Sequence, residues 1–326
     1  MKVKEKVLFL LEEKKGEYAT AESIAHSLGV TQLAVKKAVD ILRGEGYGIY
    51  TEASKGYALF PGNDARLADS IEKNLLFAAD KVKMFVYDTL PSTNTEAKRR
   101  ALEGAQEGVV VAALAQTEGR GRHGRSFFSP PDSGIYMSAV LRPYLPLQNA
   151  LLITTAAAVA SAEAIEEVCK RKTNIKWVND VYIDRKKVCG ILTEASVSAE
   201  NGNLDYAVLG IGINVFEPKS GFPPELKDVA SGILGSESGN VKSRLAAAVL
   251  DKFFTYYENL TQKKYLEAYR SRLLFVGEKV RILRGLSERE AEILGIDDNF
   301  SLLVRFQDNS VEALDSGEIS VVFSSK

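Results

Sequence analysis

Residues 109–125 read VVVAALAQTEGRGRHGR, an apolar run followed by arginines interleaved with glycines. A short, continuous apolar run rich in β-branched residues predicts a buried β-strand. Glycine lets a backbone approach a ligand closely and adopt turns that other residues resist. Arginine offers a planar, permanently charged fork that matches carboxylate and phosphate groups. The stretch therefore predicts a buried strand that leads into a mobile loop able to close over an anionic ligand.

The same loop has simpler interpretations. A basic run is often a solvated face or a nucleic-acid contact, and glycine–arginine tracts also occur as disordered RNA-binding segments. Here the tract is one short copy inside a globular pattern, directly after a strand-like segment. Taken alone, the loop leaves these alternatives open, and the remaining sequence has to separate them.

The composition indicates a folded protein of about two or three domains. The chain has 326 residues, of which 45% are apolar and 26% charged, and its formal net charge is -1. No apolar run reaches the length of a membrane span, and the first residues read as an amphipathic segment rather than a signal peptide. Two cysteines, Cys169 and Cys189, make no disulfide framework, which favours a reducing cytoplasm. With His26 and His123 as the two histidines, a histidine-based metal site or catalytic triad is not expected.

Residues 1–62 predict a winged helix-turn-helix domain. Apolar positions at helical spacing give three helices, and Gly29 suits the turn between the second and the third. Tyr47–Tyr50 and Gly56–Leu59 then read as the two strands of a wing, and 61–64 as a domain junction. The predicted helix-turn-helix spans about Ala21 to Asp40. Its third helix exposes the polar side chains that would face a DNA groove, namely Gln32, Lys36 and Lys37.

DNA binding is a separate hypothesis from the winged-helix fold. Residues 1–60 contain nine Lys and Arg against eight Asp and Glu, so the domain is almost neutral. A polyanion is usually met by a basic surface. A winged helix used for packing or for protein contacts therefore stays an alternative.

The rest of the chain predicts two further domains, so that the whole is an α+β multidomain protein. Residues 63–272 alternate helical and strand-like stretches, which indicates a mixed α/β domain with one large sheet. Residues 273–326 carry five short strands at close spacing, with a hairpin signal at Asp308-Asn309. Such a run of strands is typical of a small β-barrel.

Four polar clusters in the middle domain are candidates for the functional site. Ser92-Thr93-Asn94 stands between a strand and a helix, where it offers donors and acceptors to an amide or ureido group, or simply caps the helix. Gln116 ends the buried strand. The segment Lys176–Asp180, with Lys187 shortly after it, is either part of a functional site or a strand followed by a charged turn. The segment Gly210–Val215 is either a strand that lines a functional site or a core strand that contains glycines. It lacks the glycine spacing and the following helix of a dinucleotide-binding motif.

Taken together, these clusters resemble the biotin–protein ligases, specifically the bifunctional type that also represses the biotin operon. The matching motifs stand in the same order and the resemblance covers essentially the whole chain: GRGRHGR at 119–125, KWVND at 176–180, Arg185–Gly190 and Gly210–Val215. The resemblance implies a biotin/lipoate ligase fold of the class II synthetase type and an SH3-like C-terminal barrel. It also implies two reactions, in which biotin and MgATP first form biotinyl-5′-adenylate and a lysine of a carrier domain then takes the biotin.

The resemblance implies a role for each matching position. Those that would hold the biotin head group are Ser92, Thr93, Asn94 and Gln116. The backbone of Arg120, Gly121 and Arg122 would bind its tail and carboxylate, and Lys187 would reach the carboxylate and the α-phosphate. Those that would meet ATP or the adenylate are Arg125, Asn214, Trp177 and Asp180.

Arg122 and Lys187 are the residues implied to stabilise charge during catalysis, because an anionic nucleophile that approaches a polyanion needs fixed positive charge. Asp180 is a candidate ligand for the Mg²⁺ that accompanies ATP, or a residue that orders the site together with Trp177 and Asn179. The stretch Phe222–Leu234 resembles the loop that covers the adenylate.

The implied partners are the biotin carboxyl carrier protein of acetyl-CoA carboxylase, operator DNA and a second copy of the chain, with no membrane. Biotinyl-5′-AMP would act as corepressor by favouring a homodimer. Three positions depart from the family pattern. His123 stands where arginine is also common, Val178 replaces proline, and Thr31-Gln32 replaces Ser-Arg, which removes a phosphate-binding cation. The alternatives are a ligase whose winged helix does not repress, a regulator without catalysis, and a lipoate ligase.

Overall fold

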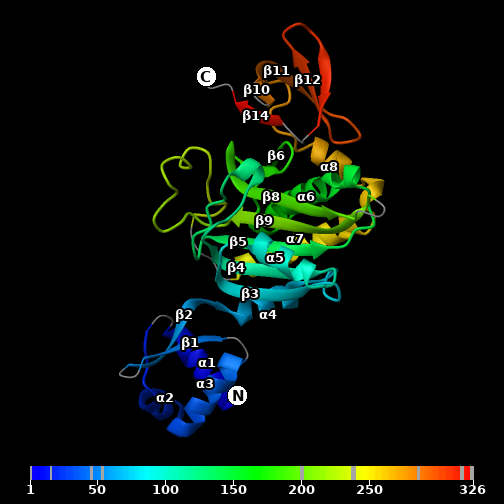
Figure 1. Ribbon diagram of the computed structural model, residues 1–326. Helices are drawn as coiled ribbons and strands as arrows, with labels where there is room; N and C mark the ends of the chain where they lie inside the picture. Colours follow the sequence, from blue (N-terminus) through cyan, green and yellow to red (C-terminus); the bar gives the residue numbers. More distant parts are fainter. Residues whose placement is uncertain are drawn as a thin grey trace.

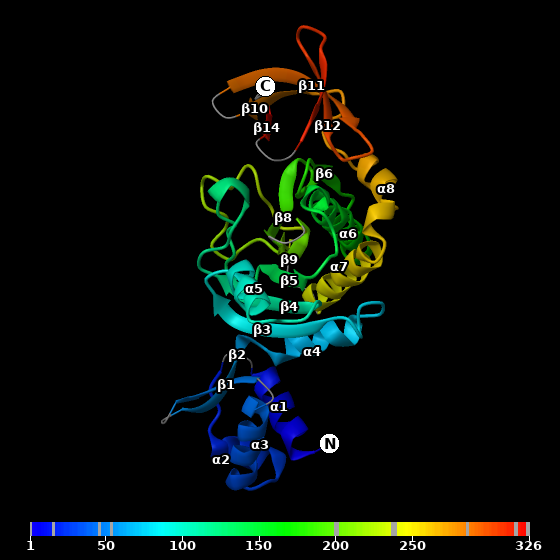
Figure 2. The same ribbon diagram turned by 45° about the vertical axis from the view of Figure 1, so that its right-hand side comes forward.

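Three parts are stacked along the length of the molecule, as Figure 1 and Figure 2 show. The computed structural model describes residues 2–14, 17–44, 47–52, 55–198, 202–235, 240–284, 287–315 and 319–323. The N-terminal domain (blue) and the C-terminal sheet (orange to red) lie at opposite ends of the central domain. The helices and strands thus fall into the three groups that the sequence predicts.

The N-terminal domain is a helix-turn-helix with a two-stranded wing. Its elements are α1 (Val3–Glu13), α2 (Ala21–Leu28), α3 (Gln32–Gly44), β1 (Tyr47–Glu52) and β2 (Gly56–Asp64). Thr20 caps α2 by accepting a hydrogen bond from the Ser23 amide, and Gly29 ends this helix with a left-handed φ of 64°. The apolar faces of the three helices meet in a small core that includes Val7, Leu11, Ile24, Val35 and Val39.

The stretch 61–64, which the sequence suggested as a junction, forms the end of β2. β1 and β2 pair in antiparallel fashion, and α4 (Ala65–Asn74) follows β2 directly. The tip of the wing at 53–54 lies outside the described residues. The link to the central domain is therefore an element of regular structure and not an open loop.

The central domain is built on a seven-stranded mixed sheet with the order β3-β4-β5-β9-β8-β7-β6. Only β3 and β4 are parallel among its neighbouring pairs. The strands are β3 (Lys83–Leu90), β4 (Val109–Gln116), β5 (Gly134–Leu141), β6 (Asn174–Lys176), β7 (Asp180–Ile183), β8 (Lys186–Val197) and β9 (Leu204–Asn214). The strand predicted in the apolar run 109–115 is thus confirmed as β4.

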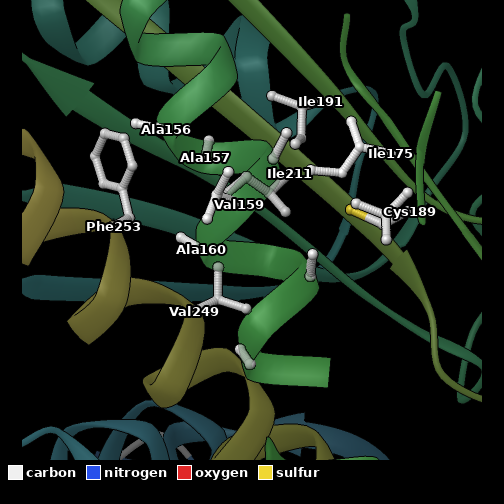
Figure 3. Close-up of a cluster of buried hydrophobic side chains, with 14 of the residues drawn as sticks. Ala156, Ala157, Val159, Ala160, Ile175, Cys189, Ile191, Ile211, Val249 and Phe253 are labelled. Carbon is white, nitrogen blue, oxygen red and sulfur yellow. The ribbon is translucent and has the colours of Figure 1, made fainter. Parts of the chain in front are cut away.

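Helices cover both faces of this sheet. α5 (Thr93–Leu102) packs Ala97 and Ala101 on one face, while α6 (Leu151–Cys169) and α7 (Val241–Tyr257) pack on the other. Figure 3 shows alanines of α6, among them Ala156 and Ala160, between the sheet and α7. Small side chains let the two helices and the sheet approach closely, which accounts for the burial of α6 on nearly all sides. Short helices complete the domain: 3-10 turns at Arg122–Gly124, Leu147–Asn149 and Leu260–Gln262, and α8 (Leu266–Arg270).

The C-terminal part is a five-stranded antiparallel sheet with the order β13-β12-β11-β10-β14. Its strands are β10 (Lys279–Arg284), β11 (Ser287–Ile296), β12 (Leu302–Phe306), β13 (Val311–Leu314) and β14 (Ile319–Phe323). Its apolar side chains continue the core of the central domain. Phe300 stacks on Tyr265 with ring centroids 5.4 Å apart. The N-terminal core, in contrast, forms a separate cluster in the described residues.

Within the described part of the chain, every helix is too short or too polar to cross a lipid bilayer.

Candidate functional site

A pocket lies where β4 leaves the sheet toward the glycine–arginine loop. Strands β8 and β9 form its floor, the start of α5 forms one wall, and the loop forms another. Its lining residues are Ser92, Thr93, Asn94, Gln116, Arg120, Gly121, Arg122, Phe127, Asn179, Lys187, Gly190, Ile191, Leu192, Gly210, Ile211 and Gly212. The structure thus brings together every residue that the resemblance assigned to biotin, although binding itself stays a prediction.

The polar end of the pocket is a buried hydrogen-bond network at the start of α5. Ser92 occupies the N-cap position of the helix, yet its hydroxyl makes no capping hydrogen bond there. The Thr93 amide and hydroxyl both donate to Gln116 Oε1, at 2.8 and 3.1 Å. Ser138 Oγ lies 2.8 Å from Thr93 Oγ1 and 2.6 Å from Asn94 Oδ1. These contacts hold the polar groups in fixed directions, and they favour a site over a simple helix cap.

Glycines in the floor make room for this network. A Cβ atom at Gly210 would lie 2.0 Å from Asn94 Oδ1, and one at Gly212 would lie 2.6 Å from the Phe127 ring. Such distances are far below ordinary contact, so a side chain at either position displaces a pocket residue. The two glycines of β9 are therefore required by the pocket and are not merely gaps in a core strand.

The glycine–arginine loop is a short hairpin. The Gly121 amide donates to the Arg125 carbonyl at 2.7 Å, and the Phe127 amide donates to the Gly119 carbonyl at 2.8 Å. Gly124 turns the tip with a left-handed φ of 72°, a conformation that glycine adopts without steric cost. His123 is also left-handed, with φ of 54°. The predicted mobility of this loop stays a prediction.

The other end of the pocket is cationic. Lys187 Nζ lies 2.7 Å from Asp180 Oδ1. Arg122 Nη1 donates to Asn179 Oδ1 at 3.3 Å, and Asn179 Nδ2 donates to the Ile191 carbonyl on the pocket floor at 2.8 Å. Asp180 and Asn179 thereby orient the two cations that the resemblance made catalytic.

Burial disfavours the charged form of the cations at this end. It lowers the pKa of the Lys176 ammonium, as do the charges of Lys187 and Arg125, whereas Asp180 opposes the shift. Burial also lowers the pKa of the Arg122 guanidinium, again against the effect of Asp180. A guanidinium stays protonated even so. An anionic group that enters this end would relieve the mutual repulsion of the cations, which makes the cluster suited to carboxylate and phosphate.

The described residues do not form a metal site around Asp180. They contain no group of three or more His, Cys, Asp and Glu side chains placed to hold a metal ion. Asp180 faces Lys187, and both Asp180 and Arg125 act electrostatically on Lys176 and Tyr182. The Asp180 carboxylate is thus paired with Lys187, and its roles as an Mg²⁺ ligand or as a residue that orders the site stay predictions.

Four predicted nucleotide-binding residues lie outside the pocket lining, namely Arg125, Trp177, Asp180 and Asn214. The Trp177 indole is buried in the core, where its Nε1 donates to the Phe300 carbonyl at 2.8 Å. The side chain thus supports the segment from below, and the assignment of Trp177 to the nucleotide stays a prediction. Asn214 is buried at the end of β9, and Arg125 is exposed beside Lys176.

The stretch Phe222–Leu234 runs along the cationic end. The Lys187 amide donates to the Val229 carbonyl at 2.8 Å, and the Ser231 amide donates to the Lys187 carbonyl at 3.1 Å. The Ile233 amide donates to the Asn214 carbonyl at 3.0 Å. This stretch is therefore tied to the same residues that the resemblance places around the adenylate.

The sequence interpretation missed several residues of the site. Ser138 and Phe127 had no polar motif around them, although Phe127 directly follows the glycine–arginine loop. Glu194 lies in β8 and accepts hydrogen bonds from Asn94 and Arg120. Its signal was a carboxylate shortly after the apolar pair Ile191-Leu192 in a strand-like stretch.

A second candidate site is the face of α3 that points away from the N-terminal core. Gln32, Lys36 and Lys37 are exposed there, as predicted, together with Leu33 and Asp40. Thr31 precedes the helix and accepts a hydrogen bond from the Ala34 amide. The face has the polar, partly basic character that a DNA groove accepts, with one carboxylate among the cations.

Comparison with known proteins identifies relatives of both domains that carry these candidate sites. Residues 86–214 match the biotin/lipoate A/B protein ligase family, and residues 3–58 match a helix-turn-helix domain. The bifunctional ligase/repressor BirA of Bacillus subtilis is 34% identical over 303 residues, which cover 90% of this chain and 91% of the relative. BirA of Escherichia coli is 29% identical and the match covers 94% of each chain. A biotin protein ligase from Aquifex aeolicus, solved in complex with biotin and ATP, has a TM-score of 0.61 and 28% identity, with 74% of this chain and 99% of that chain covered.

Proposed function

This chain belongs to the family of bifunctional ligase/repressors, and we propose that it is an ATP-dependent biotin–protein ligase that also represses biotin operon genes. The pocket is the observation that carries the proposal. One end offers neutral polar groups, at Thr93 and Asn94, and the other offers the cations Arg122 and Lys187. Biotin has the matching pair of ends, a neutral ureido head and a carboxylate tail.

In the first step, an oxygen of the biotin carboxylate attacks the α-phosphorus of ATP, and the bond to the bridging oxygen of pyrophosphate breaks. Two anions have to approach each other, so the step needs preorganised positive charge. Lys187, held by Asp180, and Arg122, held by Asn179, supply it. The hairpin at 119–127 and the stretch Phe222–Leu234 would enclose the product anhydride and keep water from it.

We propose that magnesium enters with ATP, as part of the substrate. Magnesium in nucleotide sites is usually held by phosphate oxygens and waters with one or two carboxylates. The Asp180 carboxylate is already paired with Lys187, so we assign the metal to the phosphates and not to this side chain.

In the second step, the amine of a lysine on the biotin carboxyl carrier protein of acetyl-CoA carboxylase attacks the carbonyl carbon of the adenylate. The new amide bond forms, AMP leaves with the electron pair of the broken bond, and the amine loses a proton. The cationic end of the pocket would stabilise the departing AMP.

For repression, we propose that α3 enters the major groove of operator DNA, with Gln32, Lys36 and Lys37 toward the bases and phosphates. The adenylate would act as corepressor by favouring a homodimer, which presents two such helices. The second candidate is a ligase whose winged helix does not repress. The near-neutral charge of residues 1–60 and the exposed Asp40 favour this alternative.

We also propose that the C-terminal sheet curls into an SH3-like barrel and that the protein works in the cytoplasm. An irregularity in the pairing of β11 and β12, between Ile293 and Gly295, supports the curvature. Free cysteines at 169 and 189 are consistent with a reducing compartment.

The test uses the purified full chain in two assays. Biotin-dependent exchange of pyrophosphate into ATP measures adenylate formation, and its absence would refute the ligase. A mobility shift then uses DNA from upstream of the host's biotin synthesis or uptake genes, with protein alone and with biotin plus MgATP. A shift only with both substrates supports repression. Exchange without a shift, over a panel that covers these regions, favours the second candidate.

A further inference from the structure

Glu194 links the two halves of the biotin pocket. Its Oε2 atom accepts a hydrogen bond from Asn94 Nδ2 at 2.9 Å, and its Oε1 atom accepts one from Arg120 Nη1 at 2.9 Å. Asn94 belongs to the start of α5 and Arg120 to the glycine–arginine hairpin. One carboxylate in the interior strand β8 thus joins an element at each side of the pocket.

The contact with Asn94 decides which way the amide of that residue faces. Asn94 Nδ2 donates to Glu194, while its second acceptor, the Leu192 carbonyl, lies at 3.4 Å and is therefore weaker. Ser138 occupies the opposite side of the amide, 2.6 Å from Oδ1. A carboxylate accepts and cannot donate, so Glu194 keeps the amide nitrogen toward β8 and leaves the oxygen beside Ser138 and Gly210, the latter a lining residue of the pocket. A ureido N–H needs such an oxygen as its acceptor.

The contact with Arg120 holds the hairpin. The two oxygens of Glu194 lie 2.9 and 3.2 Å from Arg120 Nη1, and about half of the Arg120 side chain is exposed. The resemblance assigned only the backbone of Arg120 to biotin, which left its side chain without a role. At the far end of the hairpin, the Phe127 carbonyl accepts from Ser129 Oγ, which in turn accepts from Gln116 Nε2. Both ends of the loop are thereby anchored to residues of the head-group network.

We infer that Glu194 is a positioning residue that couples recognition of the biotin head group to closure of the glycine–arginine hairpin. The inference rests on the proposed ligase function. When Asn94 accepts a hydrogen bond from the ureido group of biotin, the Glu194 carboxylate that orients Asn94 also holds Arg120 and its loop over the biotin tail. Loss of Glu194 would therefore weaken biotin binding and hasten escape of the adenylate, while ATP binding stays intact.

The test compares Glu194→Gln with the wild-type full chain. A glutamine has one acceptor oxygen and one NH₂ group, so it can serve only one of its two donor partners while its NH₂ opposes the other. Loss of a hydrogen bond to a charged group predicts a rise of about tenfold or more in the biotin Kd. We also expect faster release of preformed adenylate and an unchanged KM for ATP. Calorimetry with biotin, release of labelled adenylate and steady-state kinetics measure these quantities.

Further variants separate the two contacts. Arg120→Met removes only the loop contact, so it should hasten adenylate release and affect the biotin Kd less than Glu194→Gln does. Glu194→Asp keeps the charge on a shorter side chain, and it provides the measurement if Glu194→Gln fails to fold. Glu167→Gln is the matched control, because Glu167 is a carboxylate paired with Lys252 away from the pocket lining. It should behave as wild type.

Three outcomes would overturn the inference. Glu194→Gln could bind biotin and retain the adenylate as wild type does. The biotin Kd, the KM for ATP and the melting temperature could change together in both Glu194 variants, which would indicate a merely structural role. Arg120→Met could leave adenylate release unchanged, which would show that the contact between Arg120 and Glu194 does not hold the loop closed. Wild-type protein that neither binds biotin nor forms adenylate would instead refute the proposed function, and this inference with it.

Discussion

Substitution of Gly210 by alanine tests whether the floor of β9 shapes the polar end of the pocket. The added Cβ would lie 2.0 Å from Asn94 Oδ1 and 2.9 Å from its Cγ atom. The backbone of β9 pairs with β5 and β8 on both sides and cannot easily retreat. Asn94 therefore has to move, by at least about 1 Å, before the contact reaches the roughly 3 Å at which real Cβ contacts begin.

A movement of this size breaks the hydrogen bonds that orient the amide. The contacts of Asn94 with Ser138 and Glu194 are 2.6 and 2.9 Å long, and neither tolerates an added ångström. A neutral hydrogen bond contributes about 1 kcal/mol and a charge-assisted one about 1.5–3 kcal/mol, so Gly210→Ala should destabilise the fold by roughly 2.5–4 kcal/mol. A misplacement of about 1 Å in a binding group can also reduce turnover by about 100-fold.

Calorimetric titration with biotin and thermal denaturation measure the two effects. We expect Gly210→Ala to melt at a lower temperature and to bind biotin at least about tenfold more weakly. Gly235→Ala is the control, because a Cβ there meets no atom within 4 Å and the backbone does not have a positive φ. If Gly210→Ala binds biotin as tightly as wild type, the argument that this glycine makes room for a ligand-orienting Asn94 is wrong.

The remaining predictions concern charge. Arg122→Gly should let the adenylate escape and biotinylate bystander proteins, and unchanged retention in a release assay would refute its role. Lys187→Ala should slow biotin-dependent pyrophosphate exchange far more than it weakens biotin binding. Lys264→Ala, at an exposed lysine, is the control and should change neither quantity. Equal exchange in Lys187→Ala and wild type would show that Lys187 takes no part in the chemistry. Lys36→Ala and Lys37→Ala should each lower the salt dependence of operator binding by about one unit of log K against log salt, and an unchanged slope would place that lysine away from phosphate.

The sequence predicted the local features of the site well where one segment carried the information. The apolar run at 109–115 and the glycines after it define a strand and a hairpin without any long-range contact. Ser92-Thr93-Asn94 likewise forms the start of a helix. Its role in the pocket could not be separated from capping, because that distinction depends on Gln116 and Ser138, which are distant in the chain.

The sequence could not predict features that depend on contacts across the fold. Trp177 reads as a ligand-binding aromatic, but its partner is a carbonyl 123 residues away in the C-terminal part. Glu194 reads as a carboxylate in a strand, and its two partners lie 100 and 74 residues before it. Asp180 reads as a metal ligand, and only the β7–β8 hairpin reveals that it faces Lys187. Side-chain direction within a known strand is therefore the information that was missing.

The unequal division of the buried core has a consequence for how such a protein changes over generations. The N-terminal helices enclose their own apolar cluster, whereas Phe300 and the C-terminal strands share theirs with the central domain. Loss or gain of the helix-turn-helix segment would thus leave the apolar core of the central domain covered. The C-terminal sheet has no such independence, because its removal would uncover Tyr265, Tyr269 and Trp177. The helix-turn-helix domain therefore has a core of its own, whereas the ligase domain and the C-terminal sheet depend on a shared core.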